Sequence, residues 1–317
     1  MKKSKPVYLP LTHALAWIVA STLVVSGSSY AVFKQYLKRR SLSAAMDPRF
    51  SIRTIVQTGP QKEALKTEYL AELLGISSDR PPSSRHFDLS RAKERLERSP
   101  LISCATVKLI QQNTLYVDYT VRQPLAWLED YENVVIDKEA YPFPFSPFFS
   151  PKNLPSVYFG IGPFGMSSAD PERPAAQWNA PLTGKYVALA IDILNIVTDP
   201  KVADLFSVKR IDVSNAFAES YGTREIVVIT EDRMIRSING KEVHFILPRI
   251  LRLSTKNYAQ ELGNYLKLRE QMLEEERKIT AQSENLGPVM RMKEKIIDFR
   301  IPKLAFVEEQ KKQSVAK

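Results

Sequence analysis

The chain has 317 residues, of which 25% are charged, and it carries a net charge of +10. Seven of the positive charges lie within residues 1–40, which hold no Asp or Glu, so the rest of the chain carries only +3. This distribution argues against nucleic-acid binding by the body of the protein and is typical of contact with anionic headgroups beside a membrane. The single cysteine, Cys104, excludes an internal disulfide, and we expect it to be a small buried residue of a strand.

The segment 11–33 contains no Lys, Arg, Asp or Glu. As an α-helix it would be roughly 35 Å long, at about 1.5 Å per residue, and would cross a hydrocarbon core of about 30 Å. We therefore predict a single-pass transmembrane helix at 11–33 after a cytoplasmic tail at 1–10. A cleaved secretory signal peptide is the alternative, because basic residues precede the apolar run and Ser29-Tyr30-Ala31 has the small-x-small form of a cleavage site.

Basic residues lie on both sides of this segment, so charge does not fix its orientation, and a long downstream domain can be translocated regardless of flanking charge. A polar connector is expected at 34–48. Its basic residues are expected to lie at the membrane surface: Lys34, Lys38, Arg39 and Arg40.

Past the connector, the pattern predicts a small α+β domain at 49–122 with two helices on one face of a short sheet. Gly75 is placed to end the first helix, and Asp88 is a good N-cap for the second. The elements are expected in the order strand, helix, helix, strand, strand, at 50–57, 63–74, 88–97, 105–109 and 115–121. The expected core residues are Leu96, Val107 and Val117.

The remainder, 123–307, is predicted to be a larger mixed domain rich in β-structure, followed by a polar tail at 308–317 that we expect to be disordered. A helix at 248–276 is expected to bury Ile250, Leu251 and Leu253 among its apolar residues. The other expected elements are a helix at 185–198 and strands at 207–213, 224–230, 241–246 and 296–307.

Several short sequence motifs follow one another along the chain in the order seen in a known family. Asn113-Thr114-Leu115 begins a strand, and Val121-Arg122-Gln123-Pro124-Leu125-Ala126-Trp127 follows it. A Val-Ile-Asp-Lys-Glu-Ala-Tyr phrase at 135–141, a Leu-Pro-x-x-x-x-Gly turn at 154–160 and a closing run at 297–307 come next. Together they resemble the bacterial cell-division family FtsQ/DivIB. The resemblance implies a POTRA domain at 49–122 and a β domain at 123–307.

The chain departs from the family pattern at several positions. Val121 stands where the family has the Glu of Glu-Arg-x-Pro, Ala140 where it has a hairpin glycine, and Ile301 where it has an aromatic residue in the closing strand. The segment 162–184 resembles a loop insertion, and 271–291 is a long charged stretch. These departures bear on the partner surface more than on the fold.

The resemblance implies a non-enzymatic scaffold of the division complex, anchored in the cytoplasmic membrane with its N-terminus in the cytoplasm and its domains outside. The implied partners are small bitopic coiled-coil proteins of the FtsB/DivIC and FtsL kinds, bound by addition of a partner strand to the last strand. The expected contact residues are Ile297, Asp298, Phe299, Arg300, Ile301, Lys303, Ala305, Phe306 and Val307. Arg300 is expected to pair with a partner carboxylate; the alternative is an ordinary strand with a surface pair between Asp298 and Arg300.

Two other functions stay open on the sequence. A transport or outer-membrane assembly component would use a POTRA domain on exported polypeptides, but the chain lacks the run of alternating strands of about ten residues that a membrane barrel needs. A periplasmic enzyme is disfavoured, because no recognisable catalytic, phosphate-binding or Cys/His grouping is present. We therefore expect no cofactor, no metal and no small-molecule substrate.

Overall fold

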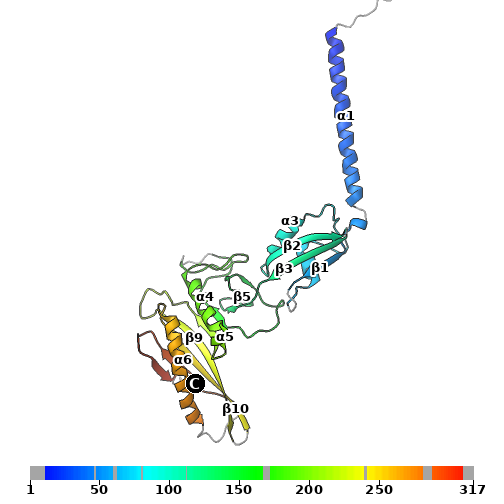
Figure 1. Ribbon diagram of the computed structural model, residues 1–317. Helices are drawn as coiled ribbons and strands as arrows, with labels where there is room; N and C mark the ends of the chain where they lie inside the picture. Colours follow the sequence, from blue (N-terminus) through cyan, green and yellow to red (C-terminus); the bar gives the residue numbers. More distant parts are fainter. Residues whose placement is uncertain are drawn as a thin grey trace, which may run out of the picture. The chain divides into compact units, whose positions relative to one another are not determined.

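The computed structural model shows a long helix followed by parts that combine helices and sheets (Figure 1). The described residues are 11–45, 48–59, 63–79, 81–111, 113–166, 172–238, 241–280 and 288–309. The expected cytoplasmic tail at 1–10 lies outside them, as do residues 310–317 of the expected C-terminal tail.

The first described element is α1 (Leu11–Ala45), a helix of 35 residues (Figure 1). Its segment Leu15–Leu37 is long and apolar enough to cross a membrane, and its side chains are not covered by the rest of the described chain. This is consistent with a single-pass membrane anchor.

The helix continues well past residue 33, so most of the predicted connector is helical instead of irregular. The residues after 33 are mainly good helix formers, and the first proline that follows the apolar segment is Pro48. The short 3₁₀-helix η1 (Pro48–Phe50) begins at that proline.

A three-stranded sheet with two helices follows. Its strands are β1 (Thr54–Thr58), β2 (Ile102–Gln111) and β3 (Thr114–Val121), in the order β1-β3-β2, and the helices between β1 and β2 are α2 (Thr67–Leu74) and α3 (Leu89–Glu97). β1 runs parallel to β3, with Ile55 beside Leu115. The predicted order of strand, helix, helix, strand, strand is therefore present.

Both helices of this part end or begin where the sequence predicts. Gly75 follows α2 in the left-handed conformation, with a φ of 68°, which glycine adopts without strain. Asp88 caps α3, because its carboxylate accepts a hydrogen bond from the backbone N–H of Arg91 at 3.0 Å. The three predicted core residues are buried: Leu96, Val107 and Val117.

The prediction for Cys104 is wrong, because its side chain is exposed on β2. Alternation along β2 makes Ala105 and Val107 the inward-facing residues. The residue before Ala105 therefore faces the opposite side of the strand.

The second sheet has ten strands, in the order β13-β12-β10-β9-β8-β7-β4-β5-β6, and β11 pairs with β10 outside this path. β9 and β10 have 13 residues each and pair antiparallel along their whole length. The strands are β4 (Ala126–Leu128), β5 (Val134–Ile136), β6 (Pro142–Pro144), β7 (Ser156–Tyr158), β8 (Ser207–Asp212), β9 (Ile226–Ile238), β10 (Lys241–Leu253), β11 (Val289–Arg291), β12 (Lys295–Asp298) and β13 (Phe306–Glu309).

The predicted long helix is wrong in its first part. Ile250, Leu251 and Leu253 belong to β10, where they pair with β9, and the helix α6 (Tyr258–Thr280) begins later. A short apolar run is compatible with either a helix or a strand, and here the neighbouring strand decides. Pro248 is tolerated within β10 because it falls at the break between the residues that pair with β11 and those that pair with β12.

Two long helices pack against this sheet. α4 (Lys185–Thr198) matches the predicted range and is followed by the short helix α5 (Pro200–Ala203). The shared core joins Val228 and Leu251 of the sheet to Ile193 of α4 and Tyr265 of α6.

A buried cluster of charged groups ties α6 to the sheet. The carboxylate of Asp232 in β9 lies 3.3 Å from Nε of Arg249 in β10 and 2.7 Å from Nε of Arg269 in α6. It also accepts a hydrogen bond from the hydroxyl of Tyr265 at 3.3 Å. Burial, together with the nearby Asp232 carboxylate, raises the pKa of Tyr265 to about 12.

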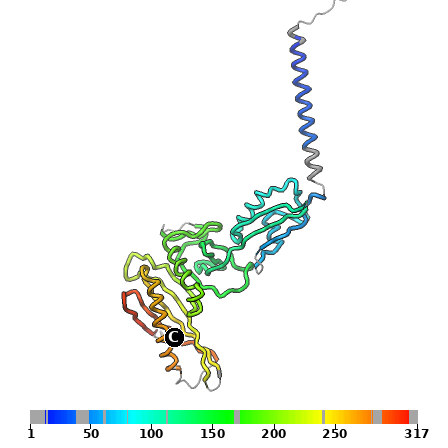
Figure 2. The backbone as a smooth tube through the Cα atoms, in the orientation of Figure 1, coloured from blue at the N-terminus to red at the C-terminus, as the bar shows by residue number. Residues whose placement is uncertain are grey.

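The chain divides into two units, whose segments can be found by residue number on the backbone trace (Figure 2). The first comprises Met1–Gly59, Leu65–Leu96 and Ala105–Tyr119, and the second comprises Pro60–Ala64, Glu97–Cys104 and Thr120–Lys317. The main boundary after Tyr119 lies close to the predicted one at 122. Two short segments that we expected in the first domain group with the second unit instead.

Candidate partner interface

The end of the second unit is a hairpin instead of the single strand predicted at 296–307. β12 pairs with β10 on one side and antiparallel with β13 on the other, so β12 is an inner strand and β13 is the edge of the sheet. Pro302 has no backbone N–H, and Lys303 adopts a left-handed φ of 64°, so the chain turns back between the two strands. Glu308 and Glu309, which we expected in a disordered tail, belong to β13.

The nine predicted contact residues do not form one surface. Ile297 and Phe299 are buried in the core of the second unit, and Asp298 and Arg300 are half-buried. The remaining five are exposed: Ile301, Lys303, Ala305, Phe306 and Val307. A partner can therefore reach the turn and β13 but cannot reach the buried side chains of β12.

Arg300 is held by groups of its own unit. Its Nη2 lies 2.7 Å from Oδ2 of Asp298, and its Nη1 donates to the backbone oxygen of Gly222 at 3.0 Å. Glu225 lies 3.4 Å from Nη1 of Arg300 and also pairs with Arg252. These bonds fasten the turn to the loop before β9. The pairing of Arg300 with a partner carboxylate stays a prediction.

Opposing effects act on the pKa of Asp298. Burial raises the pKa of this carboxyl, whereas hydrogen bonds from the side chain and backbone of Arg300 lower it, and the net result is a pKa below the usual value. The hydrogen bond with Asp298 in turn raises the pKa of Arg300. At neutral pH, Asp298 and Arg300 are therefore both charged and form an ion pair beside the turn.

Four apolar side chains are among the exposed residues of the hairpin. Ile301, Leu304, Phe306 and Val307 are 50%, 55%, 55% and 49% exposed, and we call these four residues the hairpin patch. Exposed apolar side chains on an edge strand are typical of a surface that another chain covers. The sequence did not single out Leu304, because its exposure depends on the turn.

Two hollows flank the turn. One, of about 580 Å³, lies between α6 and the turn and is lined by Leu268, Phe299 and Leu304, among others. The other, of about 470 Å³, includes Ile301 and Tyr221. Tyr221 is 82% exposed and was also missed by the sequence analysis. Hollows of this size accept several partner side chains.

The membrane-flanking prediction concerns the end of α1. Lys34 lies in α1 with an exposed side chain. Lys38, Arg39 and Arg40 belong to the same helix, but their side chains lie outside the described part of the structure. Among the described residues, no group of three or more His, Cys, Asp or Glu is arranged to hold a metal ion.

No protein-family model matches the chain, and no curated protein matches it significantly. The resemblance to a family therefore rests on the sequence motifs alone, and the candidate interface rests on the geometry of the hairpin.

Proposed function

We propose that the chain is a non-enzymatic, single-pass scaffold of the bacterial cell-division complex. The observation that carries the proposal is the hairpin patch on β13 and the turn before it, where β13 is the edge of the large sheet in the described part of the chain. An extended partner segment can continue the sheet along β13, while the exposed apolar side chains add contact area. By the sequence resemblance, the partners are bitopic coiled-coil proteins of the FtsB/DivIC and FtsL kinds.

A detail of the second unit supports the resemblance. Ala140 has a φ of 62°, a conformation that favours glycine, at the position where the family pattern has glycine. Asp137, the aspartate of the same pattern, accepts hydrogen bonds from the backbone N–H groups of Glu139 and Tyr141. The local geometry is therefore the one that the residues of the family would favour.

The partner proposal is tested by extracting the full chain from its own membrane in mild detergent and identifying the chains that co-purify. We expect bitopic division proteins, and we expect the double replacement Leu304→Glu with Phe306→Glu to abolish their recovery. Ile110→Glu is the matched control, because Ile110 is equally exposed on β2 of the first unit. Recovery of barrel-assembly proteins, or undiminished recovery with the double variant, would contradict the proposal.

The proposal places the N-terminus of α1 in the cytoplasm and both units outside the cytoplasmic membrane. A reporter that is active only outside the cytoplasm, fused after Lys317, should be active. An inactive fusion, together with activity of a second reporter that works only in the cytoplasm and is fused at the same place, would show the opposite orientation. A mature chain that begins near Val32 would show that the helix is a cleaved signal.

A further inference from the structure

In the described part of the first unit, the outer edge of β1 is not paired with another strand. β1 is an outer strand of the three-stranded sheet. The backbone N–H of Thr54 donates to the carbonyl of Asn113 at 3.3 Å, so Thr54 faces β3. Because the direction of backbone groups alternates along a strand, Ile55 and Gln57 direct their N–H and C=O groups to the outer side.

The segment around Ser83 starts to pair beside this edge, as a fourth strand would, but the pairing stops after one bridge. Ser51 and Ser83 form an antiparallel bridge, and the backbone N–H of Ile52 donates to the carbonyl of Pro82 at 2.9 Å. Pro81 and Pro82 offer no N–H, so the pairing cannot continue in the direction of β1. The chain therefore pairs antiparallel on this side as far as Ile52, and beyond it no described residue pairs with the outer edge of β1.

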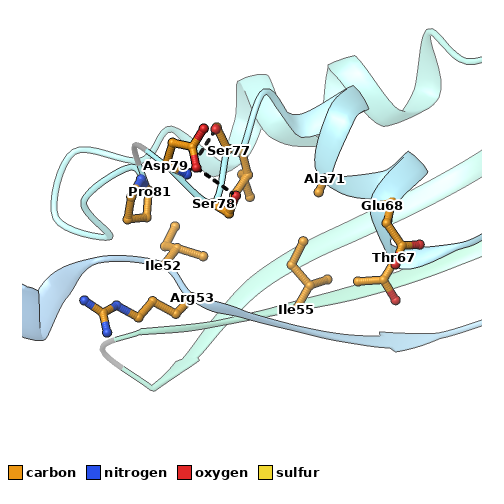
Figure 3. Close-up of a pocket in the computed structure, with 11 residues that line it drawn as sticks. Ile52, Arg53, Ile55, Thr67, Glu68, Ala71, Ser77, Ser78, Asp79 and Pro81 are labelled. Carbon is orange, nitrogen blue, oxygen red and sulfur yellow. Dashed lines mark hydrogen bonds between the residues drawn. The ribbon is translucent and has the colours of Figure 1, made fainter.

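The surface is hollowed where that pairing stops (Figure 3). The hollow, of about 590 Å³, is lined by residues of β1 and α2, by 76–79 and by Pro81. Ile55 of β1 and Ile52, which precedes β1, line it on one side, and Ala71 of α2 lies across from them in Figure 3. Glu68 lies at the α2 side of the hollow.

We propose that this edge binds an extended segment of another polypeptide, antiparallel to β1. The segment pairs with the outward backbone groups of Ile55 and Gln57 and inserts one apolar side chain between Ile55 and Ala71. Backbone groups at strand spacing beside a hollow select a polypeptide over a small ligand. This edge lies in the first unit, so the inference does not depend on the hairpin patch.

The negative charge of Glu68 at the hollow predicts which residues the bound segment should carry. The side chain of Gln57 bonds to that of Thr67 at 3.3 Å, so the first turn of α2, with Glu68, lies beside the C-terminal end of β1. An antiparallel segment has its N-terminal part at that end. A lysine or arginine there, followed by an alternating apolar stretch, therefore complements Glu68.

The experiment measures fluorescence polarisation of two labelled, end-blocked peptides against the full chain in detergent. One peptide is Lys-Thr-Val-Thr-Val-Thr, and the other is Glu-Thr-Val-Thr-Val-Thr. We expect the wild-type chain to prefer the lysine peptide by roughly two- to five-fold, which is the range for an exposed ion pair. Glu68→Lys should invert this preference. An unchanged preference in Glu68→Lys, or no binding of either peptide, would overturn the inference.

A second variant tests the hollow itself. Ala71→Trp fills it and should weaken binding of the lysine peptide by at least about ten-fold, because the inserted valine loses its site. Ser90→Trp is the matched control, since Ser90 is an exposed residue of α3. Both variants should keep the wild-type circular dichroism spectrum. Wild-type affinity in a folded Ala71→Trp variant would place the peptide elsewhere and refute the inference.

Discussion

Replacing Asp232 by alanine removes the carboxylate that lies between Arg249 and Arg269. Arg249 is 1% exposed, and its Nη1 is left with the thioether sulfur of Met272, a weak acceptor at 2.9 Å. Arg269 is 17% exposed and can turn its charge towards water. The variant therefore leaves one buried positive charge, that of Arg249, without a counter-ion.

The expected cost follows from this geometry. Breaking a buried ion pair by removing one partner costs about 3–5 kcal/mol of the free energy of unfolding. For a unit of this size, each kcal/mol lowers the melting temperature by about 2–4 °C, so Asp232→Ala should melt roughly 6–20 °C below the wild type. The paired replacement Asp232→Leu with Arg249→Met removes both charges. It should recover most of the loss, because apolar replacement of a buried pair is typically neutral or stabilising.

Thermal unfolding of the full chain in detergent, followed by tryptophan fluorescence, measures the effect. The chain has three tryptophans: Trp17 lies in α1, and Trp127 and Trp178 lie in the second unit. The signal therefore follows the unit that contains Asp232. The reasoning fails if Asp232→Ala melts within about 2 °C of the wild type, or if the paired replacement melts as low as the single one.

Three further predictions address other parts of the chain. Leu96 is fully buried, so Leu96→Ala should lower the free energy of unfolding of the first unit by about 2–5 kcal/mol in urea titrations, and an unchanged value would show that Leu96 is not a core residue. The lowered pKa of Asp298 contributes stability at pH values above the ordinary pKa of 3.8. This contribution is lost as the pH falls through the pKa of Asp298 in the folded state. The protection of 295–309 against hydrogen exchange, relative to the intrinsic rates, should therefore fall in acid, and Arg300→Met should reduce this pH dependence. Ala140→Gly should raise stability by up to about 1 kcal/mol, since it relieves a left-handed alanine at some entropic cost, and a clear loss of stability would contradict this.

The sequence predicts the first unit well because its signals are local. Gly75 ends a helix through its own backbone freedom, and Asp88 caps one through its own carboxylate. The alternation in β3 places Leu115 and Val117 on the buried face without reference to any distant segment. Such features depend on neighbours within a few residues, so they can be read from the chain alone.

The second unit is harder to predict because its ambiguous segments are decided by distant partners. Ile250 fits a helix by spacing, but the 13-residue strand β9 pairs with it and makes it a strand. The closing run looks like one strand, and its turn at Pro302 and Lys303 becomes evident only when β12 is found between β10 and β13. The exposure of Leu304 is likewise a consequence of tertiary structure.

The length of α1 limits the distance between a bilayer and the sheet of the first unit. With Leu15–Leu37 in the membrane, eight more residues of helix lead to Ala45, a rise of about 12 Å. Two residues then separate α1 from η1, and they span at most about 7 Å. The start of η1, which leads into β1, is therefore held within about 20 Å of the hydrocarbon boundary. A strand that pairs with β1 must then be presented close to the membrane, which favours partners tethered to the same membrane over freely diffusing ones.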